Sequence, residues 1–296
     1  MLAVDWGTTS FRAYRLDPAG RIVDSRSAPA GILAVENGKF ADVLERQAGE
    51  WLAAGETQVV MSGMIGMIGS RQGWFEVPYA ACPAGLDEIA AGMRKVAWHR
   101  GEAWIAPGVT CRDEAGVPDV IRGEETQILG SLDHLGAGRH TICLPGTHSK
   151  WVEIDNGRIT HFSTHMTGEA FAVFKGHSIL GRMMKDGVTD RNAFADGVRR
   201  SADAGGMLHH LFGVRSRGLF GELPDTASAS YLSGLLIGHE IHAARSAART
   251  VHLLCTPQLA EVYRQALDAV GMQSSTLDSN AVTQGLFRLA SRLDKR

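Results

Sequence analysis

Two similar segments of the chain constrain its fold more than any other feature. Residues 2–31 read LAVDWGTTSFRAYRLDPAGRIVDSRSAPAG, and residues 142–168 read ICLPGTHSKWVEIDNGRITHFSTHMTG. The alignment places Gly7, Thr8, Ser10 and Gly31 on Gly146, Thr147, Ser149 and Gly168, with a hairpin turn two residues shorter in the second copy. Each copy predicts an apolar strand, a Gly-Thr turn, an alternating strand, a hairpin turn and a third strand. Two such copies predict two similar lobes.

The segments that follow each copy predict helices alternating with strands. The first copy precedes an amphipathic helix over residues 40–54 and an apolar strand over 58–61. Near the C-terminus a strand over 251–255 precedes a helix with Thr256 as its N-cap and Pro257 at its first position. This order predicts an α/β fold with mixed sheets. A glycine-rich stretch at 136–138 predicts the boundary between lobes 1–138 and 139–296.

Composition excludes several classes of protein. The 296 residues carry a formal net charge of -2, with no run near the roughly 18 apolar residues of a membrane span. Clustered basic residues are also missing, which argues against nucleic acid as a partner. The N-terminal residues lack the pattern of a secretory signal, so we expect a cytoplasmic protein whose four scattered cysteines are reduced.

The Gly-Thr turns are the first candidate for chemistry. Asp5 ends an apolar strand, and the small residues of the turn that follows let backbone amides and hydroxyls approach a phosphate closely. The Asp5 carboxylate suits Mg²⁺, which prefers oxygen ligands. A plain hairpin turn, with Asp and Thr bonded to local backbone, is the alternative. The second turn, at residues 145–150, favours phosphate binding because two related turns can hold one polyphosphate.

Longer strings give a resemblance to a family. Residues 144–152 (LPGTHSKWV), 122–127 (RGEETQ), 62–66 (SGMIG) and 232–238 (LSGLLIG) resemble the 2-oxo-3-deoxygalactonate kinases, in the sugar-kinase branch of the actin-like ATPase superfamily. The resemblance implies two ribonuclease-H-like lobes around a nucleotide cleft. It also implies transfer of the γ-phosphate of ATP, with Mg²⁺, to the 6-hydroxyl of 2-dehydro-3-deoxy-D-galactonate.

The same resemblance implies an acidic base next to the acceptor hydroxyl. Related sugar kinases carry one at the place where Glu124 and Glu125 follow Gly123, at an expected helix start. The sequence leaves open which of the two is the base. A purely structural role, as acidic residues at a helix N-terminus, is the alternative.

Nucleotide and acceptor contacts complete the expected site. Candidates for ATP and its phosphates are Gly7, Thr8, Thr9, Ser10, Gly146, Thr147, His148, Ser149 and Lys150, with Ser233, Gly234 and Thr256 on the adenosine side. The family leads us to expect a glycine where this chain has Cys255-Thr256. The acceptor's carboxylate favours arginine and flat side chains. Candidates are Arg12, Gly63, Met64, Arg71, Trp74, Tyr79 and Arg122.

Three other functions remain open at this stage. A kinase for 2-dehydro-3-deoxygluconate or a polyol would keep both turns. A non-catalytic nucleotide-binding regulator would bind ATP without turnover, and an actin-like or chaperone-like ATPase would hydrolyse ATP without a sugar. The His-Glu-Ile-His string at 239–242 lacks the spacing of a zinc-protease motif. The oligomeric state is also open, with a homodimer as one option.

Overall fold

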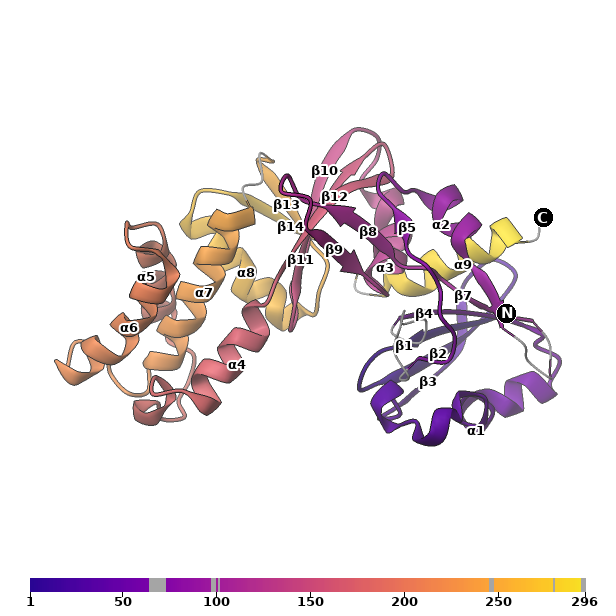
Figure 1. Ribbon diagram of the computed structural model, residues 1–296, viewed down its shortest axis with the longest axis horizontal. Helices are drawn as coiled ribbons and strands as arrows, with labels where there is room; N and C mark the ends of the chain where they lie inside the picture. The colour runs from indigo at the N-terminus through magenta and orange to yellow at the C-terminus, as the bar shows by residue number, and fades with distance from the viewer. Residues whose placement is uncertain (64–72, 97–99, 101, 245–247, 279, 294–296) are drawn as a thin grey trace. The chain divides into compact units, whose positions relative to one another are not determined.

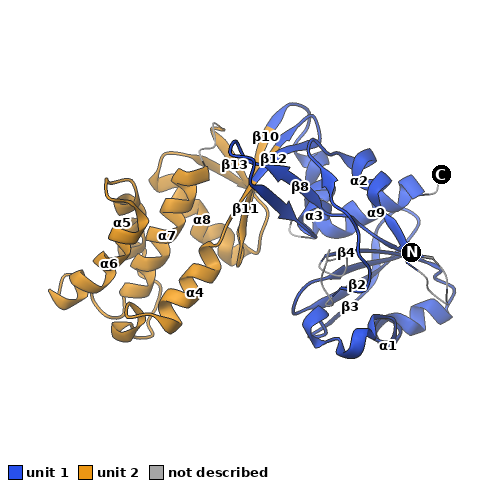
Figure 2. Cartoon of the chain, viewed as in Figure 1, with its two compact units in different colours: residues 1–139, 154–162, 278–296 blue, residues 140–153, 163–277 orange. Residues whose placement is uncertain are grey.

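The chain divides into two compact units. The computed structural model describes residues 1–63, 73–96, 100, 102–244, 248–278 and 280–293. Unit 1 comprises residues 1–139, 154–162 and 278–296, and unit 2 comprises residues 140–153 and 163–277 (Figure 2). Among the described helices, none is long and apolar enough to cross a membrane.

A mixed sheet forms the centre of unit 1. Its order is β3-β2-β1-β4-β7-β6 (Figure 1). The strands are β1 (Leu2–Trp6), β2 (Phe11–Leu16), β3 (Ile22–Ala28), β4 (Gln58–Gly63), β6 (Arg94–Val96) and β7 (Glu102–Ile105). β1 pairs antiparallel with β2 and parallel with β4, and β4 pairs parallel with β7. One edge is therefore the antiparallel meander β3-β2-β1, and the other edge strand, β6, pairs antiparallel with β7.

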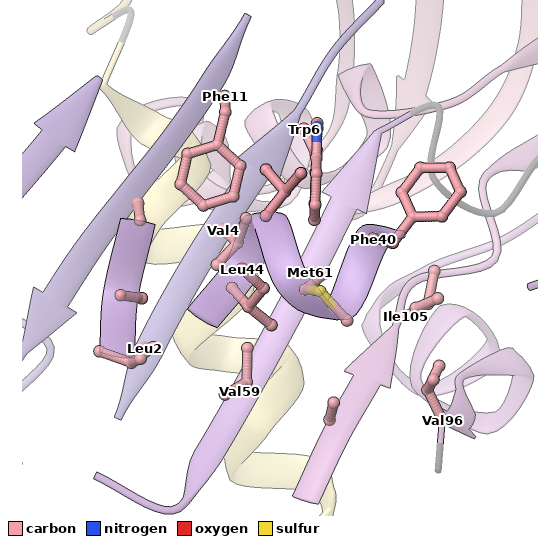
Figure 3. Packing of buried hydrophobic residues seen from close by; sticks show 14 of the residues in the cluster. Leu2, Val4, Trp6, Phe11, Phe40, Leu44, Val59, Met61, Val96 and Ile105 are labelled. Carbon is pink, nitrogen blue, oxygen red and sulfur yellow. The ribbon is translucent and has the colours of Figure 1, made fainter. Parts of the chain in front are cut away.

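Helix α1 (Phe40–Ala53) covers this sheet through one apolar face. Its buried side chains recur at helical spacing, and Phe40 lies against Trp6 with ring centroids 5.7 Å apart. Trp6 also meets Phe11 edge to face at 4.8 Å (Figure 3). These contacts fix β1 and β2 on either side of the first Gly-Thr turn.

The rest of unit 1 includes a helix from the far end of the chain. A three-stranded sheet contains β5 (Ala80–Ala81), β8 (Val109–Arg112) and β9 (Pro118–Ile121), and the helices are α2 (Leu86–Gly92), α3 (Glu124–Ser131) and α9 (Ala281–Leu293). Where α3 crosses α9, a Cβ on Gly130 or Gly285 would lie 1.8 Å from backbone of the opposite helix. The sequence predicts one boundary between residues 138 and 139, whereas the structure assigns residues 154–162 and 278–296 to unit 1.

A five-stranded sheet ordered β12-β11-β10-β13-β14 lies mostly in unit 2, although the hairpin end of β11 and β12, within residues 154–162, belongs to unit 1. The strands are β10 (Arg139–Leu144), β11 (Ser149–Asp155), β12 (Arg158–His165), β13 (Thr250–Leu253) and β14 (Gln273–Thr276). The helices are α4 (Thr167–His177), α5 (Arg191–Ser201), α6 (Gly206–Leu219), α7 (Ser228–Ala244) and α8 (Pro257–Ala269). Strand for strand, this order repeats β3-β2-β1-β4-β7 of unit 1, which confirms the duplication and the α/β class.

The aligned glycines have the same role in both copies. A Cβ on Gly31 would lie 2.3 Å from backbone of the first Gly-Thr turn, and one on Gly168 would lie 2.4 Å from backbone of the second. In each copy the next residue donates its amide to the turn: Ile32 to Gly7, and Glu169 to Thr147. The repeated glycine therefore lets the chain pack directly against the turn.

Candidate active site

The carboxyl ends of β1 and β4 place Asp5 beside Ser62 in unit 1. Asp5 is 6% exposed, and its Oδ2 lies 2.7 Å from Nη2 of Arg12. Burial raises the pKa of Asp5, and the Arg12 guanidinium partly opposes that shift. Apart from this Arg12 contact, Oδ2 has no hydrogen-bond partner among the described residues. Arg12 thus neutralises Asp5 and leaves a carboxylate lone pair unused.

The turn that follows β1 leaves its hydroxyls accessible. Gly7 donates its amide to the carbonyl of Ser10 at 2.9 Å and closes the turn. Thr8 and Thr9 are exposed, and Ser10 is half-buried. Backbone and hydroxyl groups are therefore available for an anion next to Asp5.

Glu125 occupies the first turn of α3 and is completely buried. Its Oε2 accepts the amide of Gly123 at 2.6 Å, whereas Oε1 has no hydrogen-bond partner among the described residues. Burial, followed by the negative charge of Glu124, raises the pKa of Glu125 to about 8. A carboxyl group with a pKa near neutrality is suited to accept a proton.

Glu124 has a different environment from its neighbour. It is only half-buried, and its Oε2 accepts the amide of Arg122 at 2.9 Å. This bond fixes the loop before α3. The structure therefore distinguishes two adjacent glutamates that the sequence could not rank.

Arg122 lies buried on the ring of Tyr79. Its guanidinium carbon is 4.2 Å from the ring centroid, and Nη2 donates to the carbonyl of Val77 at 2.8 Å. Nε and Nη1 are buried and lack hydrogen-bond partners among the residues the structure describes. Because a buried donor without a partner is costly, these two groups are fitted to bind an acceptor from a ligand.

The end of β4 lies against the start of α3 at a position that has no side chain. Gly63 has φ +101, and a Cβ there would lie 2.4 Å from the carbonyl oxygen of Trp6. Next to this junction, Thr126 Oγ1 donates to the carbonyl of Gly123 at 2.7 Å and accepts from Ser62 Oγ at 3.2 Å. The contact connects the strand that carries Ser62 to the helix that carries Glu125.

The structure describes only one of the three remaining acceptor-binding candidates of unit 1. Trp74 packs against the sheet core and stacks on Phe40 at 6.1 Å. Met64 and Arg71 lie outside the described residues. Unit 1 therefore brings together Asp5, Arg12, Gly63, Tyr79, Arg122, Glu124 and Glu125, around the ends of β1 and β4 and the start of α3.

The second Gly-Thr turn joins β10 to β11 in unit 2. Gly146 is half-buried, and Thr147 and His148 are exposed. Glu169, in the first turn of α4, donates its amide to the carbonyl of Thr147 and pairs through its carboxylate with His148. The turn therefore presents a hydroxyl, an imidazole and bare backbone to solvent.

Ser149 belongs to a buried hydrogen-bond chain that the sequence did not reveal. Tyr263 donates to Glu240 Oε2 at 2.8 Å, so Ser149 Oγ, 2.9 Å from the phenol oxygen, donates to Tyr263. Trp151 donates to the other carboxylate oxygen of Glu240 at 2.8 Å. The only signal in the sequence is a glutamate within the apolar helix α7. Ser149 therefore holds the turn in place through its buried hydroxyl. Lys150, the next residue of the strand, is buried on the opposite side.

The three candidates for the adenosine side lie in different surroundings in the structure. Ser233 lines a pocket of about 240 Å³ in unit 2, together with Phe171, Lys175 and Lys185. Gly234 instead packs against α5, where a Cβ would lie 2.0 Å from the carbonyl oxygen of Phe194. Thr256 is exposed at the N-cap of α8 and is not among the residues that line this pocket.

Comparison with known proteins places this arrangement in a family. The family model described as 2-keto-3-deoxy-galactonokinase matches residues 5–289. This chain belongs to that family. A probable 2-dehydro-3-deoxygalactonokinase of Rhizobium meliloti (strain 1021) is 36% identical over 97% of this chain and 95% of its own length. The 2-dehydro-3-deoxygalactonokinase of Escherichia coli (strain K12) is 33% identical over 97% of this chain and 96% of its own.

Solved structures agree with the family. The crystal structure of a candidate 2-dehydro-3-deoxygalactonokinase from Sinorhizobium meliloti has a TM-score of 0.89 and 34% identity, covering 99% of this chain and 98% of its own. The activator of the 2-hydroxyisocaproyl-CoA dehydratase from Clostridium difficile, solved with bound ADPNP, has a TM-score of 0.50 at 13% identity, covering 100% of this chain and 94% of its own. The second likeness concerns the fold alone.

Proposed function

We propose that the chain is an ATP-dependent kinase that transfers the γ-phosphate to the 6-hydroxyl of 2-dehydro-3-deoxy-D-galactonate. Membership of the 2-keto-3-deoxy-galactonokinase family supports this activity. The observation that carries the mechanism is the buried Glu125 carboxyl, which has a pKa of about 8 and one oxygen without a hydrogen-bond donor among the described residues.

In this proposal Glu125 is the general base. Its Oε1 accepts the proton of the acceptor hydroxyl as the oxygen of that hydroxyl bonds to phosphorus and the bond to ADP breaks. Oε2 stays bonded to the Gly123 amide, which holds the carboxyl in place. Glu124 keeps its bond to the Arg122 amide and raises the proton affinity of its neighbour.

Arg122 binds the carboxylate of the sugar acid. Two features support this assignment: buried donors that lack partners in the part of the chain that the structure describes, and a guanidinium stacked on Tyr79. A neutral polyol would leave that cation without an anionic partner, so the proposal favours a sugar acid over a polyol. Trp74 supports the site from the core and does not need to touch the acceptor.

Each Gly-Thr turn is a candidate phosphate-binding element of its own unit. The accessible Thr8 and Thr9 support this role in unit 1, and Thr147 and His148 support it in unit 2. Ser149 acts by fixing the second turn through Tyr263. The pocket beside Ser233 is the candidate for the adenosine, with Lys175 and Lys185 at its edge.

Asp5 is the residue that would hold Mg²⁺. Its buried carboxylate oxygen, which contacts only Arg12 among the described residues, fits a hard cation, and the hydroxyls of Thr8 and Thr9 follow in the adjacent turn. When bound, the ion would supply positive charge against the phosphates during transfer. Arg12 opposes the rise in the pKa of Asp5 that burial causes.

The proposal is tested by ADP release over a panel of acceptors. We expect turnover with 2-dehydro-3-deoxy-D-galactonate, weaker turnover with its gluconate epimer, and none with glycerol or without acceptor. Mass spectrometry and ³¹P NMR of the product should show one phosphate, on C6. Failure of every 2-oxo-3-deoxy acid to stimulate ADP release would exclude the proposed function.

A further inference from the structure

Helix α6 carries a row of exposed apolar side chains. Leu208, Phe212 and Leu219 are 81%, 58% and 60% exposed. The buried residues of the same helix, His210, Leu211 and Val214, face the core of unit 2 from the opposite side. Figure 2 shows α6 at the edge of this unit, with α5 and α7 behind it. Single exposed apolar residues are ordinary, but a continuous row marks a contact surface.

The row has the spacing of a helix-pairing seam. Leu208, Phe212, Arg215 and Leu219 follow one another at intervals of four, three and four residues. These intervals are those of alternating a and d positions in a coiled coil, where each side chain faces a partner helix. Two heptads of this pattern span the 14 residues of α6. The surface therefore fits another helix of similar length.

The seam is complementary to itself when the second helix runs antiparallel. A twofold axis through the middle of the seam places Leu208 opposite the partner's Leu219, and Phe212 opposite the partner's Arg215. Each pair then occurs twice. The leucines make an apolar contact, and the guanidinium lies on an aromatic ring, which attracts a cation. The one charged residue of the seam thus meets a suitable side chain in a second copy.

We propose that two copies of this chain pair through the outer face of α6, antiparallel about a twofold axis. A second copy explains the seam better than a lipid surface does. Membrane-bound helices keep their cations on the polar face, whereas Arg215 lies within the apolar row. Because both copies use the same face, the interface is isologous, and the assembly is limited to a dimer.

Sedimentation velocity and light scattering over a micromolar concentration series test the proposal. The wild-type chain should be a dimer, and Phe212→Glu should be a monomer with an unchanged circular dichroism spectrum, because it places a charge in the seam. Val188→Glu is the matched control, since Val188 is 91% exposed in unit 2 and outside the seam, and it should remain a dimer. A monomeric wild-type chain, or a dimeric Phe212→Glu variant, would overturn the proposal.

Disulfide cross-linking tests the direction of the helices. A 1:1 mixture of Leu208→Cys and Leu219→Cys should give a cross-linked pair under mild oxidation, because these positions face each other. Leu208→Cys alone should not, because two copies of position 208 lie about 16 Å apart along antiparallel helices, at 1.5 Å per residue. A disulfide needs Cα atoms within about 7 Å. Cross-linking of Leu208→Cys alone as readily as of the mixture, or no cross-linking in the mixture, would refute the antiparallel pairing. Neither readout requires kinase activity, so the proposed function and the dimer can fail separately.

Discussion

Replacing Glu125 by Gln separates the chemical role of this residue from its structural role. Glutamine has the shape of a protonated glutamic acid but cannot accept the acceptor's proton. We expect kcat to fall by about 10²- to 10⁴-fold, the usual contribution of a general base. The assay is acceptor-dependent ADP release at saturating ATP. A decrease smaller than tenfold would refute Glu125 as the base.

The same substitution should make the folded chain more stable above acidic pH. Glu125 has a pKa of about 8 when folded, against an ordinary value of 4.5. Between these values the folded state holds one proton more than the unfolded state, so its stability falls as pH rises. At pH 7 that loss is on the order of 3 kcal/mol, from about 2.5 units at 1.36 kcal/mol each. Glutamine lacks this titration, so the variant should gain that amount relative to wild type.

Denaturant unfolding of both proteins from pH 4 to pH 9 measures this difference. The stability curves should lie close together near pH 4 and separate as pH rises, with the Gln variant above. Curves that stay parallel would show that Glu125 has no raised pKa in the folded state. A variant that is less stable at every pH would show that the buried carboxylate is held by contacts that glutamine cannot replace.

Glu124→Gln is the matched control because it changes the adjacent charge. The Glu124 carboxylate is the second cause of the raised pKa of Glu125. Wild-type kcat/KM should rise with pH and level off above an apparent pKa near 8. In the Glu124→Gln variant the profile should shift to lower pH while kcat stays within about tenfold. An unshifted profile would contradict the coupling between the two glutamates.

Three other substitutions test the remaining contacts. Asp5→Asn should lower kcat at least about a hundredfold across a MgCl₂ titration, and near-normal turnover would show that the first turn is structural. Arg122→Lys keeps the charge but loses the planar stack on Tyr79, so KM for the sugar acid should rise about tenfold while KM for ATP stays unchanged. The exposed control Arg112→Lys should leave both KM values unchanged. Equal changes in both KM values of Arg122→Lys would exclude carboxylate binding. Tyr263→Phe removes a donor to buried Glu240, so it should lower the free energy of unfolding by about 1–3 kcal/mol and raise KM for ATP. The control Tyr231→Phe should leave KM for ATP unchanged. An unchanged KM for ATP in Tyr263→Phe would limit that hydrogen-bond chain to stability.

The sequence predicted the elements that repeat or that follow local rules. The meanders, the helix at Phe40, and the helix start at Pro257 depend on turn residues, apolar spacing and caps, all of which are local. The predicted end of the first helix differed from the structure by one residue. The Gly-Thr turns could be located because each follows an apolar strand, and Asp5 could be located because it lies at the end of the first of these strands.

Contacts between distant residues could not be predicted in the same way. The crossing of α3 and α9 depends on Gly130 and Gly285, which are 155 residues apart, and no pattern in either segment points to the other. Tyr263 looks like one more apolar residue of its helix until the fold brings Glu240 and Ser149 to its hydroxyl. The ranking of Glu125 over Glu124 likewise depends on burial, which adjacent identical residues do not reveal.

A crystal structure with 2-dehydro-3-deoxy-D-galactonate and a non-hydrolysable ATP analogue tests the central claim most directly. The account predicts the acceptor's 6-hydroxyl within about 2.6–3.2 Å of Glu125 Oε1 and its carboxylate on Arg122. An acceptor bound away from α3, or one whose 6-hydroxyl meets a different carboxylate, would contradict the assignment of Glu125 as the base.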